Sequence, residues 1–161
     1  LLITCILNTL FVIYIFIFCF LFFFFLNFLH LKILLLSILV GCASSDIGGY
    51  ITGKIFKGPK LTKISPKKTI SGSVGSIFIT MIVLSILVFY FTETFNIKIL
   101  FVAIITSLAC QFGDLFFSFL KRKAKVKDTG NFFPGHGGVL DRLDGIFLGI
   151  PFGFFSIIFL N

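Results

Sequence analysis

The sequence predicts an all-α membrane protein, a polytopic transmembrane helix bundle of about five spans with two basic loops. Of its 161 residues 58% are hydrophobic, 26 are Phe, and the mean hydropathy is +1.15. Only 14 basic and 6 acidic side chains accompany them, too few to cover that much apolar surface in water. The apolar residues also gather in runs of about 17 to 25, the length that crosses a bilayer.

Each apolar run is a candidate span, because backbone groups in hydrocarbon must bond within their own helix. The runs are Leu1 to Phe28, Ile33 to about Tyr50, Val74 to Phe91, Ile99 to Leu120 and Gly145 to Leu160. His30 and Lys32 mark a turn after the first run, which fits one tilted span or parts of two. The polar connections are Gly53 to Ser73, Thr92 to Lys98 and Lys121 to Asp144. Because each connection is short, residues 1–161 are expected to form one membrane domain.

The start of the sequence indicates that it does not begin with a signal peptide. The sequence opens Leu-Leu-Ile without Met or basic residues, which is not typical of a signal peptide. We expect an N-terminally truncated protein that lacks earlier helices.

The cysteines lie singly in apolar runs, which favours small apolar fillers over disulfides or a zinc site. They are Cys5, Cys19, Cys42 and Cys110.

The cations predict the orientation, since Lys and Arg near span ends stay on the cytoplasmic side. One basic loop contains Lys54, Lys57, Lys60, Lys63, Lys67 and Lys68, and the other contains Lys121, Arg122, Lys123, Lys125, Lys127 and Arg142. Two spans separate the loops, so alternation also places both on one face. A purely topological role, or anchoring to anionic headgroups, is the alternative for these lysines.

The acidic residues need a further explanation, because cytoplasmic retention requires no carboxylates. Asp114 interrupts an apolar helix, where an isolated charge costs about 2.5–3.5 kcal/mol. If that helix continues to Lys121, then Asp114, Ser118 and Lys121 share one face, which leads toward Asp141 and Asp144. Converging carboxylates predict a site for a hard cation such as Mg²⁺, and a buried Asp–Lys pair is the structural alternative.

Two glycine-containing segments predict a phosphate ligand. Pro134-Gly135-His136-Gly137-Gly138 offers backbone N–H groups to an anion, between a Lys/Arg cluster and Asp141-Arg142-Leu143-Asp144. The segment 46–72 is expected to form a second loop of similar chemistry, in which Pro66 fixes a turn and holds Ser65, Lys67 and Thr69 for phosphate contact. A flexible basic connector is the alternative for the second segment alone.

These residues carry a resemblance. Ser118-x-Leu120-Lys121-Arg122, four residues, Lys127-Asp128, then Pro134-Gly135-His136-Gly137-Gly138 and Asp141-Arg142-x-Asp144 resemble the signature of phosphatidate cytidylyltransferases, the CDP-diacylglycerol synthases. Upstream, Asp46…Gly49-Tyr50…Gly53-Lys54 and Ser65-Pro66-Lys67-Lys68-Thr69 are also similar, so the likeness covers about residues 41 to 160. Ser71 departs from the glutamate that many members carry there.

The resemblance implies that CTP and phosphatidic acid are joined into CDP-diacylglycerol with release of pyrophosphate, using Mg²⁺ and a possible K⁺. It implies metal binding by Asp114, Asp141 and Asp144, and catalytic phosphate contacts by Ser118, Lys121 and Arg122. The substrate-binding residues implied by the signature and the segment 46–72 are Asp46, Tyr50, Lys54, Ser65, Lys67, Lys68, Thr69, Lys127, Asp128, His136, Gly137, Gly138 and Arg142. His136 is expected to contact a phosphate or headgroup rather than act as a base.

The same resemblance sets expectations for partners and location. The lipid bilayer is an expected partner, a homodimer is expected only by family analogy, and no nucleic acid is expected. The site should lie on the cytoplasmic side of a bacterial cell membrane, at the headgroup layer. Two alternatives remain open: a CTP-using membrane lipid kinase of the polyprenol or phytol kind, and a non-catalytic membrane transporter that uses Asp114 as an ion site.

Overall fold

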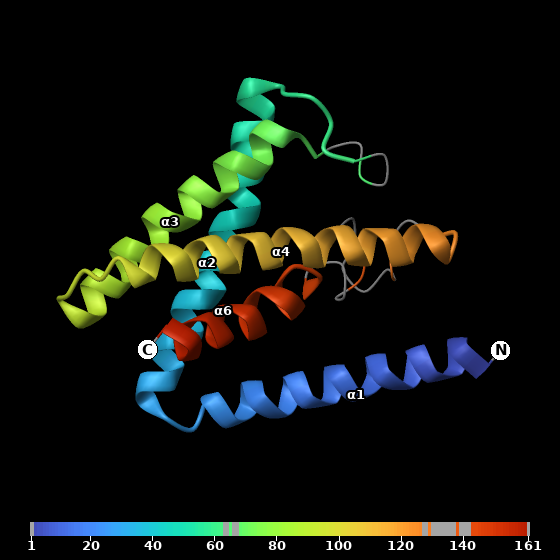
Figure 1. Ribbon diagram of the computed structural model, residues 1–161, viewed down its shortest axis with the longest axis horizontal. Coiled ribbons are helices and arrows are strands. Elements are labelled where there is room, and N and C mark those ends of the chain that lie inside the picture. Colours follow the sequence, from blue (N-terminus) through green and yellow to red (C-terminus); the bar gives the residue numbers. More distant parts are fainter. Residues whose placement is uncertain are drawn as a thin grey trace. The chain divides into compact units, whose positions relative to one another are not determined.

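The computed structural model describes residues 2–62, 65, 68–126, 129, 138 and 143–160. Over these residues the chain forms five α-helices, which Figure 1 colours along the sequence. They are α1 (Leu2–Phe25), α2 (Leu29–Phe56), α3 (Ile70–Thr92), α4 (Lys98–Lys123) and α6 (Ile146–Leu160). The chain divides into two compact units, Leu1–Leu36 and Ser37–Asn161, and the division falls within α2. The predicted all-α class is confirmed.

The helices correspond to the apolar runs of the sequence. In the described part of the chain, α2, α3 and α4 are long and apolar enough to cross a membrane, with 28, 23 and 26 residues. Thr9–Phe25 within α1 and Ile146–Leu160 are shorter apolar stretches. The architecture is therefore that of a helical membrane protein.

The connection between α1 and α2 lies a few residues earlier in the chain than predicted. Helix α1 ends before residues 26–28, and His30 and Lys32 belong to the first turn of α2 rather than to the connection. The side-chain amide of Asn27 donates to Phe23 O at 3.1 Å. Asn side chains that bond the local backbone compete with helix hydrogen bonds, which explains an end at this point.

The loop predicted for 46–72 overlaps the span predicted to reach about Tyr50, and the structure supports the span: residues 46–56 and 70–72 are helical. Helix α2 continues to Phe56 and α3 begins at Ile70, so residues 57–69 alone connect the two helices. The glycines in α2 serve close packing instead of breaking the helix: a Cβ added to Gly48 would lie 2.9 Å from Ile79 Cβ. Small residues let membrane helices approach closely, which outweighs the poor helix propensity of Gly.

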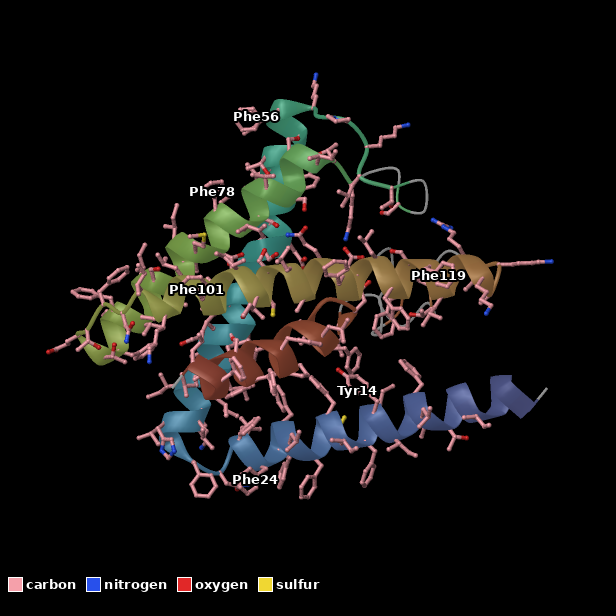
Figure 2. All side chains as sticks on the ribbon, viewed as in Figure 1. Tyr14, Phe24, Phe56, Phe78, Phe101 and Phe119 are labelled. Atoms are coloured by element: carbon pink, nitrogen blue, oxygen red, sulfur yellow. The ribbon has the colours of Figure 1, made fainter. Side chains whose placement is uncertain are left out.

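In the second unit several small polar side chains lie inside and many phenylalanines lie outside, although Phe117, Phe147 and Phe154 are buried. Thr80, Thr106 and Ser107 are all 0% exposed. Exposed phenylalanines of this unit that Figure 2 labels are Phe56, Phe78, Phe101 and Phe119. This distribution is suited to a lipid environment, because apolar phenylalanine side chains are compatible with hydrocarbon, while polar side chains form hydrogen bonds between helices.

Helix α4 packs against both α3 and α6. The segment that leads into α6 and the helix itself carry Gly145, Gly149 and Gly153, four residues apart and thus on one face. A Cβ added to Gly149 would lie 2.5 Å from Cys42 Sγ, and one on Gly153 would lie 2.9 Å from Thr106 Oγ1. The absence of side chains at these glycines allows α6 to approach α2 and α4.

A Thr→Val substitution is expected to change the free energy of unfolding differently at two buried threonines. Thr106 Oγ1 is buried and has no hydrogen-bond partner among the described residues, whereas Thr80 Oγ1 donates to Ser76 O at 2.8 Å. Thr106→Val removes an unsatisfied hydroxyl and should leave the free energy of unfolding unchanged or higher. Thr80→Val removes a made bond and should lower it by about 0.5–1.5 kcal/mol. Unfolding of both variants in detergent measures the difference, and equal destabilisation would contradict the assignment.

Candidate active site

One face of α4 carries a stripe of polar side chains. Ser107, Gln111, Asp114, Ser118 and Lys121 follow one another at spacings of four and three residues. Residues at these spacings lie above one another on a helix. Ser118 Oγ donates to Asp114 Oδ1 at 3.5 Å, which confirms the predicted alignment.

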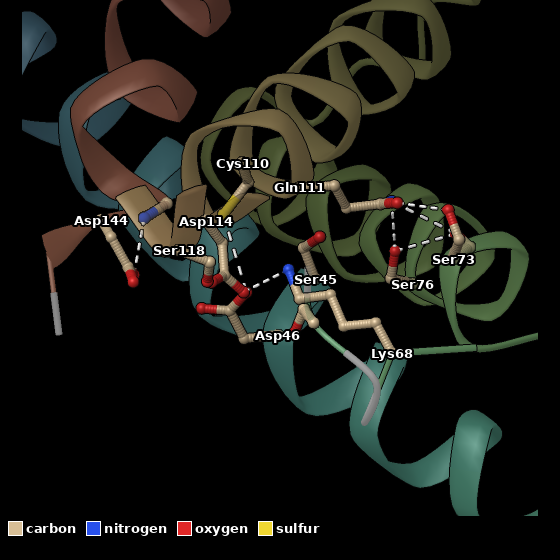
Figure 3. A network of polar contacts seen from close by, with 12 residues as sticks. Ser45, Asp46, Lys68, Ser73, Ser76, Cys110, Gln111, Asp114, Ser118 and Asp144 are labelled. Atoms are coloured by element: carbon tan, nitrogen blue, oxygen red, sulfur yellow. Dashed lines mark hydrogen bonds and ion pairs between the residues drawn. The ribbon is translucent and has the colours of Figure 1, made fainter. Parts of the chain in front are cut away.

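Lys68 reaches Asp114 from the connection between α2 and α3. Its Nζ forms an ion pair with Asp114 Oδ2, and Asp46 of α2 lies beside this pair (Figure 3). Cys110 Sγ lies 3.8 Å from Asp46 Oδ1, as a weak donor. The pair with Lys68 is the Asp–Lys alternative predicted for Asp114. The Lys68 and Asp114 side chains are 25% and 28% exposed, so both remain accessible to a ligand.

Backbone hydrogen bonds hold Lys68 in place. Leu61 N donates to Lys68 O at 2.8 Å, and Lys68 N donates to Ser65 O at 3.1 Å. The next residue, Thr69, is the N-cap of α3, and its Oγ1 accepts from Gly72 N at 3.1 Å. This cap fixes where α3 begins, and it therefore fixes the position from which Lys68 extends.

Asp144 joins the opposite end of the polar stripe. Its Oδ2 lies 3.6 Å from Lys121 Nζ, and its Oδ1 accepts from Gly145 N at 2.9 Å. The pKa of Asp144 is raised to about 6, first by burial and then by repulsion from Asp114, while the Lys121 ammonium and the Gly145 N–H oppose the shift. A carboxylate in this state binds an added positive charge favourably, because the charge stabilises its ionised form.

A cavity of about 300 Å³ opens between α2, α3, α4 and the connection 57–69. Its lining residues are Ser45, Asp46, Gly49, Tyr50, Leu61, Ser65, Lys68, Thr69, Gly72, Ser73, Ser76, Gln111 and Asp114. Cationic and anionic groups thus meet in one hollow, which is suited to a polyanionic ligand and its counter-cation.

One wall of the cavity is a hydrogen-bonded network of serines around Gln111 (Figure 3). Gln111 Nε2 donates to Ser76 Oγ at 2.6 Å, and Ser73 Oγ donates to Gln111 Oε1. Ser45 Oγ and Ser107 Oγ lie 2.9 Å apart, and Ser107 Oγ lies 3.3 Å from Ser76 Oγ. The network joins α2, α3 and α4, so it fixes the positions of the three helices that line the cavity.

The acidic groups of the cavity have the chemistry of a magnesium site. Mg²⁺ takes oxygen ligands and is generally held by one or two carboxylates together with substrate phosphates. Among the residues that the structure describes, no three His, Cys, Asp or Glu side chains are grouped to hold a metal ion. Asp46 and Asp114 supply the carboxylates of the cavity, and this set fits Mg²⁺ shared with a phosphate ligand.

Comparison with known proteins agrees with this geometry. The model of the cytidylyltransferase family matches residues 3–160. The chain belongs to the cytidylyltransferase family. Relatives named phosphatidate cytidylyltransferase include those of Rickettsia bellii (strain RML369-C), 42% identical over 120 residues, and Helicobacter pylori (strain ATCC 700392 / 26695), 35% identical over 117 residues.

The alignment with these cytidylyltransferases covers part of each protein. The Rickettsia bellii match includes 70% of this chain and 52% of the relative, and the Helicobacter pylori match includes 73% and 44%. The relative from Staphylococcus aureus (strain COL) is 42% identical over 109 residues, which are 66% of this chain and 42% of that protein. The chain thus spans about half the length of the curated relatives it matches.

The structure of this cytidylyltransferase-family chain brings many of the predicted site residues together. Those that line the cavity are Asp46, Tyr50, Ser65, Lys68, Thr69 and Asp114. Ser118 and Lys121 continue along the same face of α4, and Lys121 leads to Asp144. Predicted residues of the segment 46–72 and of α4 therefore meet in one cavity.

Lys54, Arg122 and Gly138 do not line the cavity. Lys54 Nζ lies 5.8 Å from the centre of the Tyr50 ring, in a cation–π arrangement at the end of α2. Arg122 is exposed at the end of α4, and Gly138 is buried. Seven predicted residues lie outside the described residues: Lys67, Lys127, Asp128, His136, Gly137, Asp141 and Arg142.

Sequence reasoning missed the serine and glutamine wall of the cavity. Ser73, Ser76 and Gln111 were not predicted to line a site, although all three do. The spacing rule used for Asp114, Ser118 and Lys121 would have reached Gln111, which precedes Asp114 by one helical turn. The serines of α3 carry no comparable signal, because single serines are common in membrane helices.

Proposed function

We propose that the protein transfers a cytidylyl group from CTP to phosphatidic acid, forming CDP-diacylglycerol and pyrophosphate. The observation that carries this proposal is the meeting of Lys68 with Asp46 and Asp114 in one cavity of a cytidylyltransferase-family membrane chain. The curated relatives are named phosphatidate cytidylyltransferase, which supports the same substrates.

In this reaction an oxygen of the lipid phosphate attacks the α-phosphorus of CTP. A new P–O bond forms, the bond between the α-phosphorus and the bridging oxygen breaks, and the electron pair leaves with pyrophosphate. A phosphate monoester has a second pKa near 6 and is largely ionised at neutral pH, so no general base is required. Catalysis then depends on bringing two polyanions together in line and on neutralising their charge.

The described cations and anions suit these tasks. Lys68 and Lys121 would neutralise phosphate oxygens, and Ser118 would donate a hydrogen bond from the same face of α4. Asp46 and Asp114 would hold Mg²⁺ together with phosphate oxygens of the substrate. Asp141 and Asp144 are the further candidate acids, and K⁺ is a candidate second cation. Mg²⁺ supplies charge stabilisation to the transferring group and the departing pyrophosphate when it is bound.

The membrane scaffold suits a lipid substrate, because phosphatidic acid keeps its acyl chains in hydrocarbon and its phosphate at the headgroup layer. We place the basic residues of the connection 57–69 and of the end of α4 on the cytoplasmic side of a bacterial cell membrane. The positive-inside rule supports this orientation, and CTP is available on that side.

The position of a radioactive label separates this reaction from its alternatives. Membranes that contain the protein should incorporate label into lipid from α-³²P-CTP and release γ-³²P label in pyrophosphate. A lipid kinase would place the γ-label in the lipid instead, and a transporter would incorporate neither label. Either of these outcomes would refute cytidylyl transfer.

A further inference from the structure

The serine and glutamine network lies deeper in the helix bundle than the carboxylates. Gln111 precedes Asp114 by three residues, which is about 4.5 Å along the axis of α4, away from the basic end of that helix. Ser45 likewise precedes Asp46 in α2, and Ser76 lies in the second turn of α3. These residues form the floor of the cavity, whereas Lys68 and the connection 57–69 lie nearer its mouth.

The floor is polar and is held together by its own hydrogen bonds. Ser45 and Ser76 are 2% and 1% exposed, and both bond within the network. On the side of α2 and α3 the backbones are in close contact, since a Cβ added to Gly72 would lie 2.7 Å from Gly49 O. At that contact the two helices touch through backbone atoms.

Size and chemistry therefore favour a hydrophilic occupant. The cavity measures about 300 Å³, the lower end of the range for ligand sites. The large side chains with apolar surface among the lining residues are Leu61 and Tyr50, and they lie toward the connection and the end of α2, away from the serines and Gln111 of the floor. A heterocycle with hydrogen-bonding edges matches the floor better than a lipid tail.

We infer that the floor binds the nucleobase of the nucleotide, and that Gln111 makes the site selective for cytosine over uracil. This inference rests on the proposed function, because the phosphates must then lie toward Lys68 and Asp114. With the base on the floor, the nucleotide would extend toward the mouth of the cavity, where the cations meet the lipid phosphate.

The orientation of the Gln111 amide gives the selectivity. Its Nε2 lies 3.2 Å from Ser73 O, a backbone carbonyl that can only accept, so the nitrogen must face that atom. The Ser73 hydroxyl in turn donates to Oε1. The amide is therefore fixed, and Oε1 retains a second lone pair as a permanent acceptor. Cytosine offers an amino donor at its 4-position, where uracil has a second acceptor that Oε1 would repel.

A Gln111→Met substitution tests the inference, since Met has similar length and no hydrogen-bonding amide. The readout is kcat/KM for CTP and for UTP, measured with phosphatidic acid in membranes containing the full chain. We expect the KM for CTP to rise at least about tenfold with kcat changed less, and the CTP-to-UTP ratio to fall at least about tenfold. An unchanged ratio would overturn the inference.

Ser107→Ala is the matched control. Ser107 bonds Ser45 and Ser76 in the same network and is 0% exposed, but it does not line the cavity. A merely structural network would make the two variants alike, whereas base recognition predicts that Ser107→Ala keeps the CTP-to-UTP ratio. If Gln111→Met does not fold, Ser76→Ala replaces it, because Ser76 lines the cavity and bonds Gln111.

Binding of nucleoside monophosphates separates this inference from the proposed reaction. CMP should raise the unfolding temperature of the wild-type protein more than UMP does, and Gln111→Met should remove this difference. If the wild-type protein binds CMP selectively but transfers no label, the proposed reaction is refuted and the inference about the base site stands. If label is transferred from CTP and UTP at equal rates, nucleotidyl transfer stands and the inference of a cytosine-selective base site is refuted.

Discussion

Asp114→Asn is expected to reduce cytidylyl transfer about 100-fold or more, the range found when one preorganised electrostatic group is removed from an active site. Asp114 forms the ion pair with Lys68 and accepts a hydrogen bond from Ser118, and its charge repels that of Asp144. Asparagine keeps the size of this side chain and removes its charge. The variant would leave the Lys68 ammonium without its partner and would weaken the proposed hold on Mg²⁺.

The measurement is the initial rate of α-³²P label entering lipid, at equal amounts of protein in the membrane. Glu93→Gln is the control, because it makes the same acid-to-amide change at an exposed residue that follows α3. Glu93→Gln should retain wild-type activity. Asp114→Asn activity within about threefold of wild type would remove Asp114 from the proposed site.

Gly113→Ala is expected to have the largest effect on packing near the site. A Cβ at this position would lie 2.6 Å from Asp144 O and 3.2 Å from Gly145 Cα. Both are backbone atoms, which cannot rotate away as a side chain can, so α4 and the segment before α6 must separate. Overpacking of this kind typically lowers the free energy of unfolding by about 1–3 kcal/mol. The shift would also displace Asp144 from Lys121 and reduce activity.

Gly49→Ala is the matched substitution for the stability measurement. The added Cβ would lie 3.5 Å from Gly72 O and from Ser76 Cβ, which is ordinary van der Waals contact. Both variants gain the same helix propensity of about 1 kcal/mol over glycine. The difference between their unfolding free energies in detergent therefore reports the contact alone. A Gly113→Ala protein as stable as Gly49→Ala would contradict the close approach of α4 to Asp144.

The face of α4 shows how much local pattern can predict. Asp114, Ser118 and Lys121 were aligned from their spacing alone, and the hydrogen bond between Ser118 and Asp114 confirms that alignment. Helical periodicity is a local property of the chain, so no tertiary information was needed. The same reasoning located the apolar spans to within a few residues at most ends.

The glycines of α2 show where local pattern fails. Gly53 was expected in the polar connection, and Gly48 and Gly49 where the predicted span and the predicted loop overlap, yet α2 continues through all three to Phe56. Glycine favours a turn or a close helix contact depending on what lies opposite. Here Ile79 and Gly72 of α3 lie opposite, which a single sequence does not reveal.

The sequence by itself determined the all-α membrane class, the spans and the set of acids and cations from which a site is built, because composition and periodicity act locally. Only the tertiary structure decided that Lys68 pairs with Asp114, that Lys121 pairs with Asp144, and that Gln111 and three serines form one wall of the cavity. These contacts join residues far apart in the chain, and their partners are chosen by how closely helices pack through glycine and serine.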